Sequence, residues 1–224
     1  MTLKPDLKQT LGWSGFAALI GFLVPAVFSS GLRWERPLFL IPYVAIVGAF
    51  LFLYFRSTSI SLKQLINRWP YGLIGLAAAT FLLMRNIQGQ PASAIPEGGQ
   101  LILSLVWIGL VYGVIDGLLL NVMPVLAVQG PRFYESTPSW KERLVRGLIA
   151  LAASVVVTVA YHSGYTEFHG SKMVSVIIGN VIITSSYLLT GSPLAPVVTH
   201  VIMHVAALLH GMETTLQLPP HYAP

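Results

Sequence analysis

The chain has 224 residues, of which 54% are hydrophobic and only 9% are charged, and its formal net charge is +5. Soluble domains carry about 25% charged residues. This composition and the mean hydropathy of +0.72 therefore indicate an integral membrane protein, and the positive charges are better explained by their placement beside spans than by nucleic-acid binding. The absence of cysteine excludes disulfides, thiolate catalysis and cysteine-ligated zinc.

Seven apolar segments predict transmembrane helices, because a helix needs roughly 20 apolar residues to cross a bilayer. The segments are 11–30, 37–55, 70–84, 100–128, 144–165, 173–190 and 193–211. The third is short for a span, and the fourth is long enough to tilt or kink. The sequence thus predicts an all-α, polytopic helical membrane protein. We expect a single domain over residues 1–224, because every polar stretch is too short to fold separately.

Two segments need separate interpretation. The first apolar run is longer than the roughly 7–15 residues of a signal-peptide core and lacks a small-residue cleavage site, so we expect an uncleaved anchor span. Between the second and third runs, ISLKQLINRW (60–69) alternates apolar and polar residues. That spacing predicts a short interfacial helix in the headgroup layer.

The positive charges divide unequally between the two sides of the predicted spans. One side carries Lys4, Lys8, Arg56, Lys63, Arg68, Arg132, Lys141, Arg143 and Arg146, and the other carries Arg33, Arg36, Arg85 and Lys172. The positive-inside rule then predicts a multi-pass protein of the lipid bilayer with a cytoplasmic amino terminus. With seven spans, the tail from Glu213 onward would lie outside.

Four ionisable side chains lie inside these apolar runs. They are Asp116 in LVYGVIDGLLL, His162 in VVTVAYHSGY, and His200 and His204 in APVVTHVIMHVAALL. A charged group at the centre of a spanning helix costs at least about 2.5–3.5 kcal/mol, so such residues usually face the protein interior and serve a function. These four residues are the candidate site.

Their spacing suggests how they could act together. His200 and His204 are four residues apart, so they project from one helix face and can bind one metal ion or polarise a substrate. Each can instead hydrogen-bond a neighbouring helix. Tyr112, one turn before Asp116, is placed to donate a hydrogen bond to it. Counting about 1.5 Å per residue from the outer ends of the spans puts Asp116 deep in the bilayer and His162 near the outer surface. If the four residues form one site, we expect His162 at its rim.

Three motifs resemble those of the CAAX prenyl protease and bacteriocin-processing (CPBP) superfamily. TGSPLAPVVTHVIMHVAALLHG resembles the last motif, in which Leu-Ala-Pro begins a helix with His-x-x-x-Asn/Asp. AYHSGY is similar to the second motif, Phe-x-x-x-His, and IDGLLLN falls where Glu-Glu-x-x-x-Arg is expected. The resemblance covers residues from about 100 to 212.

The resemblance implies a multi-span intramembrane peptidase that cuts prenylated or peptide substrates with a carboxylate-activated water. Asp116 takes the position of the first Glu and would be the general base. His162 and His200 match the family's histidines and would stabilise the oxyanion, whereas His204 replaces Asn and would position the water or the substrate.

Departures from the motifs keep other functions open. Gly117 replaces the second Glu, Asn121 the Arg, and Thr158 the Phe. A diverged member without peptidase activity could be an assembly factor or an accessory subunit of a larger membrane complex. A third alternative is a zinc or iron site made by the aspartate and the three histidines. Because the family's chemistry uses a carboxylate and water, we expect no cofactor and no tightly held metal.

Overall fold

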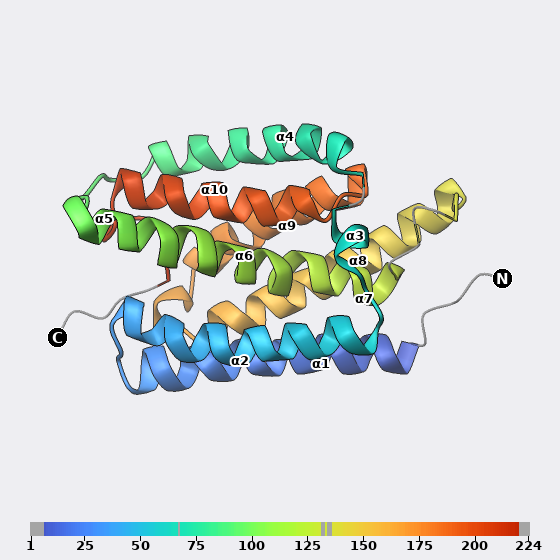
Figure 1. Cartoon of the computed structure of the whole chain (residues 1–224), viewed down its shortest axis with the longest axis horizontal. Coiled ribbons are helices and arrows are strands. Elements are labelled where there is room, and N and C mark those ends of the chain that lie inside the picture. The colour runs from blue at the N-terminus through green and yellow to red at the C-terminus, as the bar shows by residue number, and fades with distance from the viewer. Residues whose placement is uncertain (1–6, 67, 131–132, 134–135, 220–224) are drawn as a thin grey trace.

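The computed structural model describes residues 7–66, 68–130, 133 and 136–219, and this part of the chain is helical with no strand. Seven long helices run side by side along the molecule (Figure 1). They are α1 (Leu7–Val24) with η1 (Pro25–Gly31), α2 (Arg36–Ser57), α4 (Trp69–Gln88), the long helix (Gly98–Gln129), α8 (Trp140–Ser163), α9 (Lys172–Thr190) and α10 (Leu194–His210).

Six of these helices are long and apolar enough to cross a membrane, as expected for a multi-pass membrane protein. The all-α, polytopic prediction is therefore confirmed, but with six such helices where seven spans were expected. The seventh segment forms α10, which has 17 residues and at about 1.5 Å per residue falls short of the roughly 30 Å hydrocarbon core. Leu209 is the only exposed residue of α10.

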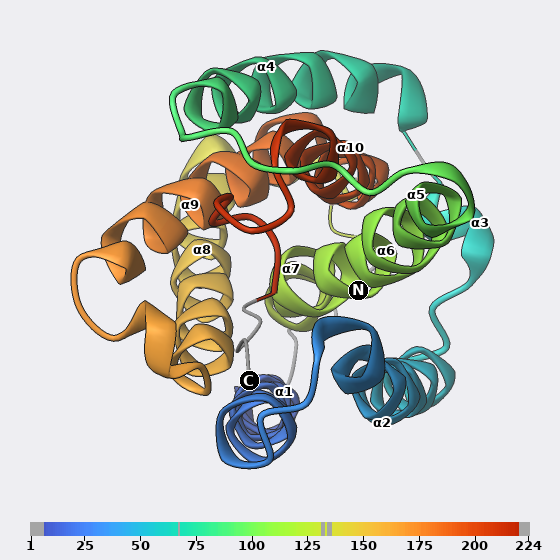
Figure 2. The same cartoon turned by 90° about the vertical axis from the view of Figure 1, so that its left-hand side faces the viewer.

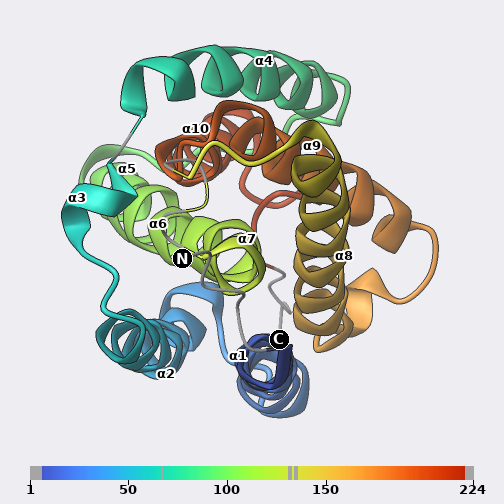
Figure 3. The same cartoon turned by 90° about the vertical axis from the view of Figure 1, so that its right-hand side faces the viewer.

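Viewed along their axes, the helices surround α10 and the long helix. In the end views of Figures 2 and 3, α1 and α2 lie together on one side of the bundle and α4 lies on the opposite side. The long helix and α10 lie between them, with α8 and α9 along another side. The two central helices carry three of the four candidate residues.

The predicted interfacial helix is shorter than expected. Only α3 (Leu62–Leu65) forms, and a capping box begins it: Ser61 Oγ accepts from the Gln64 backbone N–H, and the Gln64 side chain accepts from the Ser61 backbone. Trp69, the last residue of the predicted segment, instead begins α4. Asn67 lies outside the described residues.

The helix ends group the positive charges as the sequence suggested. Lys8, Arg56, Lys63, Arg68, Lys141, Arg143 and Arg146 lie at the bundle end where α1 begins, and Arg33, Arg36, Arg85 and Lys172 lie at the other (Figure 1). Lys4 and Arg132 lie outside the described residues. The grouping gives the two ends different charge without identifying the cytoplasmic one.

A glycine stripe brings the long helix close to α10. The stripe consists of Gly109, Gly113 and Gly117, each facing a valine of α10. A Cβ atom added to Gly113 would lie 2.9 Å from the Cα of Val201, so the two backbones are too close for any larger residue. Small residues allow such close helix packing in membranes. The stripe holds Asp116, its neighbour in sequence, beside the histidines of α10.

The long helix is not a uniform α-helix. It runs through α5 (Gly98–Ser104), the π-helical η2 (Leu105–Tyr112), α6 (Gly113–Asp116), the π-helical η3 (Gly117–Val122) and α7 (Met123–Gln129). π-Helical turns are rare and often occur at functional sites. Asp116 therefore ends a single α-helical turn between two π-helical segments, a local geometry that hydropathy does not predict.

Candidate functional site

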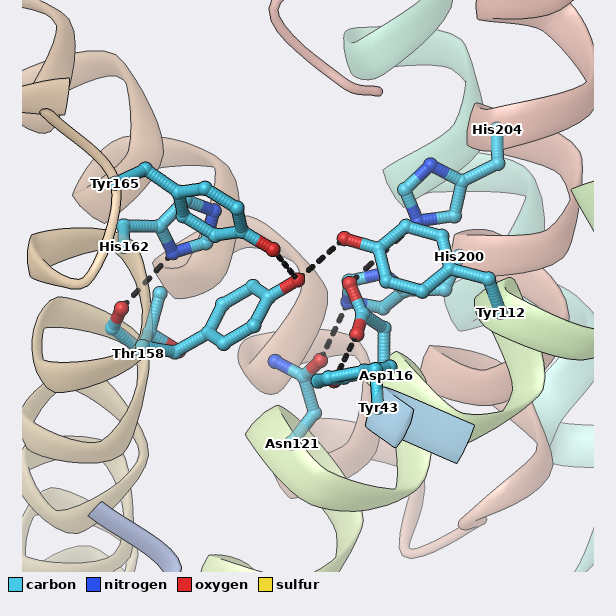
Figure 4. Close-up of polar contacts among 10 residues, drawn as sticks. Tyr43, Tyr112, Asp116, Asn121, Thr158, His162, Tyr165, His200 and His204 are labelled. Atoms are coloured by element: carbon cyan, nitrogen blue, oxygen red, sulfur yellow. Dashed lines mark hydrogen bonds and ion pairs between the residues drawn. The ribbon is translucent and has the colours of Figure 1, made fainter. Parts of the chain in front are cut away.

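A cavity of about 330 Å³ lies between the long helix, α4, α8, α9 and α10. All four residues singled out from the sequence line it, namely Asp116, His162, His200 and His204. Small-molecule sites typically have volumes of about 300–1,000 Å³. Figure 4 shows side chains of the long helix, α8 and α10 facing one another across this space, with Tyr43 of α2 beside Asp116.

The Asp–His cluster, defined here as Asp116, His200 and His204, is the most tightly assembled part of the cavity. One ligand-type atom of each residue lies within 4.8 Å of the others. His204 Nε2 is 3.7 Å from Asp116 Oδ2, too far for a direct hydrogen bond. His200 Nδ1 and both ring nitrogens of His204 are buried without a hydrogen-bond partner. Buried polar atoms are nearly always paired, so these nitrogens are available to a water molecule, an ion or a substrate group.

Asp116 is held by a residue that the sequence did not suggest. The Tyr43 hydroxyl, on α2, donates a hydrogen bond to Asp116 Oδ1. The expected donor, Tyr112, instead has its hydroxyl 2.6 Å from that of Tyr161. The prediction for Tyr112 was therefore wrong, because the tyrosine reaches across to α8 rather than along its own helix. The other carboxylate oxygen of Asp116, Oδ2, lies on the side of His204.

The tautomer of His200 follows from its neighbours. His200 Nε2 lies 2.7 Å from Asn121 Oδ1. The Asn121 amide nitrogen donates to the side-chain oxygens of Asn180 and Thr184, so Oδ1 must be the acceptor toward His200. Nε2 of His200 therefore carries the hydrogen, and Nδ1 presents a lone pair to the cluster.

Asn121 belongs to a buried polar network that joins the long helix to α8 and α9. Asn180 Nδ2 donates to Thr158 Oγ1 at 2.6 Å, and Ser154 Oγ donates to the Leu120 carbonyl oxygen at 2.6 Å. Ser154 is also 2.8 Å from the Thr184 hydroxyl. A satisfied buried network fixes side-chain geometry. The sequence suggests that Asn180 and Thr184 could help helices to pack, but it does not show their partners, because polar residues on separate helices give no joint signal in the sequence.

His162 lies on the other wall of the cavity, in the last turn of α8. Its Nδ1 donates to the Thr158 backbone carbonyl at 2.9 Å, which leaves Nε2 with a lone pair. His162 is half-buried and lies outside the Asp–His cluster. The long helix projects beyond its neighbours at the end of the bundle where α8 finishes (Figure 1). Counting residues from the start of the long helix therefore overstated how much deeper Asp116 lies than His162.

A chain of three tyrosine hydroxyls connects the two walls (Figure 4). The Tyr161 hydroxyl is 2.6 Å from that of Tyr112 and 2.7 Å from that of Tyr165. The Tyr112 ring also lies 4.8 Å from the His204 ring, measured between centroids. Hydroxyls in a water-poor site can stabilise a developing negative charge. Tyrosine is common near membrane interfaces, which hides this role in the sequence.

The cavity reaches the outer surface between α4 and α9. Two lining residues, Leu82 on α4 and Ile178 on α9, are 50% and 55% exposed. Both side chains are apolar and belong to helices apolar enough to span a membrane. The segment Leu216–Pro219 also lines the cavity, and Gln217 is hydrogen-bonded to Asn86 and Gln90 of the α4 end.

A scan against protein-family models and searches of curated proteins and of solved structures gave no match to this chain. The resemblance to the peptidase superfamily therefore rests on the three motifs alone.

Proposed function

We propose that this protein is an intramembrane peptidase of the kind that its motifs resemble, and that it hydrolyses a peptide bond of a bilayer-embedded polypeptide. The observation that carries the proposal is the Asp–His cluster on the wall of a cavity with an apolar, lateral mouth. Peptide hydrolysis needs an activated water and donors for the oxyanion. Groups suited to both tasks line this cavity.

Asp116 is the general base of the proposal. Tyr43 occupies Oδ1, so a water molecule can donate one hydrogen to Oδ2 and the other to the lone pair of His200 Nδ1. As Asp116 takes the first proton, the water oxygen bonds to the scissile carbonyl carbon. The proton then passes to the leaving nitrogen as the carbon–nitrogen bond breaks, which yields a carboxylic acid and an amine.

The oxyanion donors differ from those that the resemblance implies. Neutral His200 and His162 each use their only N–H on another group, Asn121 and the Thr158 carbonyl, and so present acceptors to the cavity. The hydroxyls of Tyr112 and Tyr161 line the cavity from its two walls, and their chain with Tyr165 uses two of its three hydrogens, which leaves one to donate to an oxyanion. We therefore assign oxyanion stabilisation to the tyrosines, and orientation of the water to His200.

Two departures from the family motif fit the packing here. A Cβ at Gly117 would lie 2.8 Å from the Cα of Val197, which leaves no space for the family's second Glu. Asn121, at the position of the family's Arg, is completely buried and orients His200. Both departures are thus accommodated by the packing, and a peptidase here would work without the family's second Glu and its Arg.

The proposal includes an orientation in the membrane and a class of substrate. We infer that the bundle end with more positive charge, where α1 begins, faces the cytoplasm. The substrate would be an apolar segment that enters between α4 and α9 from the hydrocarbon. An accessory subunit, by contrast, would hold a partner helix there without cutting it.

The test is cleavage in heavy-oxygen water. Purified protein in lipid nanodiscs would be incubated with a library of single-span apolar peptides, and new carboxyl termini carrying one heavy oxygen would be sought by mass spectrometry. We expect cleavage to fall at least about 100-fold in Asp116→Ala and His200→Ala, the size of a general-base contribution. Asp116→Glu should retain activity, since it restores the family's longer carboxylate.

His169→Ala is the matched control, because His169 is exposed and lies outside the cavity. It should cleave at the wild-type rate. Folded wild-type protein that releases no labelled terminus from the library would overturn the proposal. Stable retention of an uncut membrane partner in the same experiment would favour the accessory subunit.

A further inference from the structure

We propose that the Asp–His cluster is a binding site for one divalent transition-metal ion, with zinc as its best match. The ligands are Asp116 Oδ2, His200 Nδ1 and a ring nitrogen of His204. The site does not depend on the proposed peptidase activity, since a chain that cleaves nothing could hold the ion equally well. It replaces our sequence-based expectation that no metal is tightly held.

The hydrogen-bonding capacity of the cluster is the first argument. Asp116 Oδ2 and His200 Nδ1 both present lone pairs, and His204 adds a third on one of its ring nitrogens. With His204 in the tautomer that directs its lone pair at the cluster, one water molecule, which has two hydrogens, cannot satisfy all three acceptors. A cation accepts all three lone pairs together.

The second argument is that two of the proposed ligands are held in place by hydrogen bonds with other residues. A metal-binding histidine almost always donates its other N–H to a carbonyl or carboxylate, which fixes the ring and its tautomer. His200 does so to Asn121 Oδ1 at 2.7 Å. Asp116 is held from behind in the same way by the Tyr43 hydroxyl. Two of the three ligands are therefore already oriented toward a common point.

Charge is the third argument. Asp116 is only 2% exposed, and none of the described residues that line the cavity is a lysine or arginine. A buried carboxylate normally has a counter-charge, because an unpaired charge away from water is costly. A divalent ion between Asp116 and the two histidines supplies it.

The spacing allows a zinc ion after a small adjustment. Zinc binds nitrogen and oxygen ligands at about 2.0–2.2 Å, so two ligands of a tetrahedral site lie about 3.4 Å apart. Asp116 Oδ2 and His204 Nε2 are 3.7 Å apart, and the whole cluster lies within 4.8 Å. His204 can rotate to close the difference, since no hydrogen bond holds either of its nitrogens.

Three protein ligands leave one tetrahedral position open, which is typical of catalytic rather than structural zinc. In this structure the open position would face the cavity. A bound ion would polarise the water that is otherwise activated by Asp116.

The test measures metal binding directly. Protein purified through a tag without histidines would be stripped with a chelator and titrated with Zn²⁺ against a coloured competitor, and with Co²⁺ while the visible absorption is recorded. We expect about one ion per chain and the intense cobalt bands of a four-coordinate site. Zinc-edge X-ray absorption should show two imidazole ligands. Iron would be quantified in the same elemental analysis.

His204→Asn and Asp116→Asn should each weaken zinc binding at least tenfold. His210→Asn is the matched control, because it makes the same change on α10 at a residue that does not line the cavity and is bonded to the Gln90 carbonyl. Asn121→Ala should weaken binding by roughly 10–100-fold, as loss of an outer hydrogen bond does.

Failure of this inference differs from failure of the proposed function. Folded wild-type protein that binds no stoichiometric zinc or iron, or that shows no imidazole ligands at the zinc edge, overturns the metal site whether or not the variants fold. Cleavage that persists in chelator would do the same while leaving the peptidase intact. Stoichiometric zinc without cleavage supports the metal site alone.

Discussion

The hydroxyl of Tyr43 donates a hydrogen bond to the carboxylate of Asp116, 73 residues later in the chain and on a different helix. This contact commits one carboxylate oxygen to the protein and leaves the other for whatever occupies the cluster. It makes α2 part of the site, although α2 carries none of the residues that the sequence singled out.

Removing this hydroxyl should destabilise the protein. We expect Tyr43→Phe to lower the free energy of unfolding by about 1–3 kcal/mol, because it leaves a buried carboxylate oxygen without its donor. Denaturation in mixed micelles measures this change. Tyr54→Phe, at a buried tyrosine of the same helix whose hydroxyl makes no hydrogen bond to another described residue, should change stability less. Equal effects of the two substitutions would contradict the role of Tyr43.

The family's arginine should not be tolerated at position 121. Asn121 is completely buried within a satisfied polar network, so Asn121→Arg would place a charged side chain where there is neither space nor a counter-charge. We expect little monodisperse protein in size-exclusion chromatography. Asn86→Arg, at an exposed position of α4, should elute as the wild type does. A well-folded Asn121→Arg protein would refute this packing.

The glycine stripe should be sensitive to a single methyl group. Gly113→Ala forces a Cβ to 2.9 Å from the α10 backbone and should cost about 1–3 kcal/mol of stability. Gly147→Ala on α8 meets no atom within 4 Å and should be neutral or stabilising by up to about 1 kcal/mol. Thermal unfolding in detergent compares the two. A neutral Gly113→Ala would show that α10 packs less closely than described.

Orientation can be tested with single cysteines, because the chain has none of its own. Lys63 in α3 and Glu35 before α2 are exposed and lie at opposite ends of the bundle. In intact cells, a membrane-impermeant maleimide should label Glu35→Cys, and should label Lys63→Cys only after permeabilisation. The reverse pattern would place the amino terminus outside.

The sequence by itself determined the class of the protein and much of its element order. Hydropathy is a property of consecutive residues, so the apolar runs could be located without knowing how they pack. Likewise, the spacing of His200 and His204 put both on one face of a helix, because that face is set by local helical geometry. The sequence alone could not show that α10 is enclosed by the other long helices, or that it is shorter than they are. Enclosure depends on how the helices pack around it.

The tertiary structure decided how the candidate site is assembled. The partner of Asp116 is Tyr43 rather than Tyr112, and the tautomer of His200 follows from Asn121 and its own partners on α9. These contacts join residues on different helices, and their distances depend on how closely the backbones pack along the glycine stripe. Local sequence carries no record of that packing. The change of His200 from an expected donor to a ligand-like acceptor therefore became visible only when the helices were assembled.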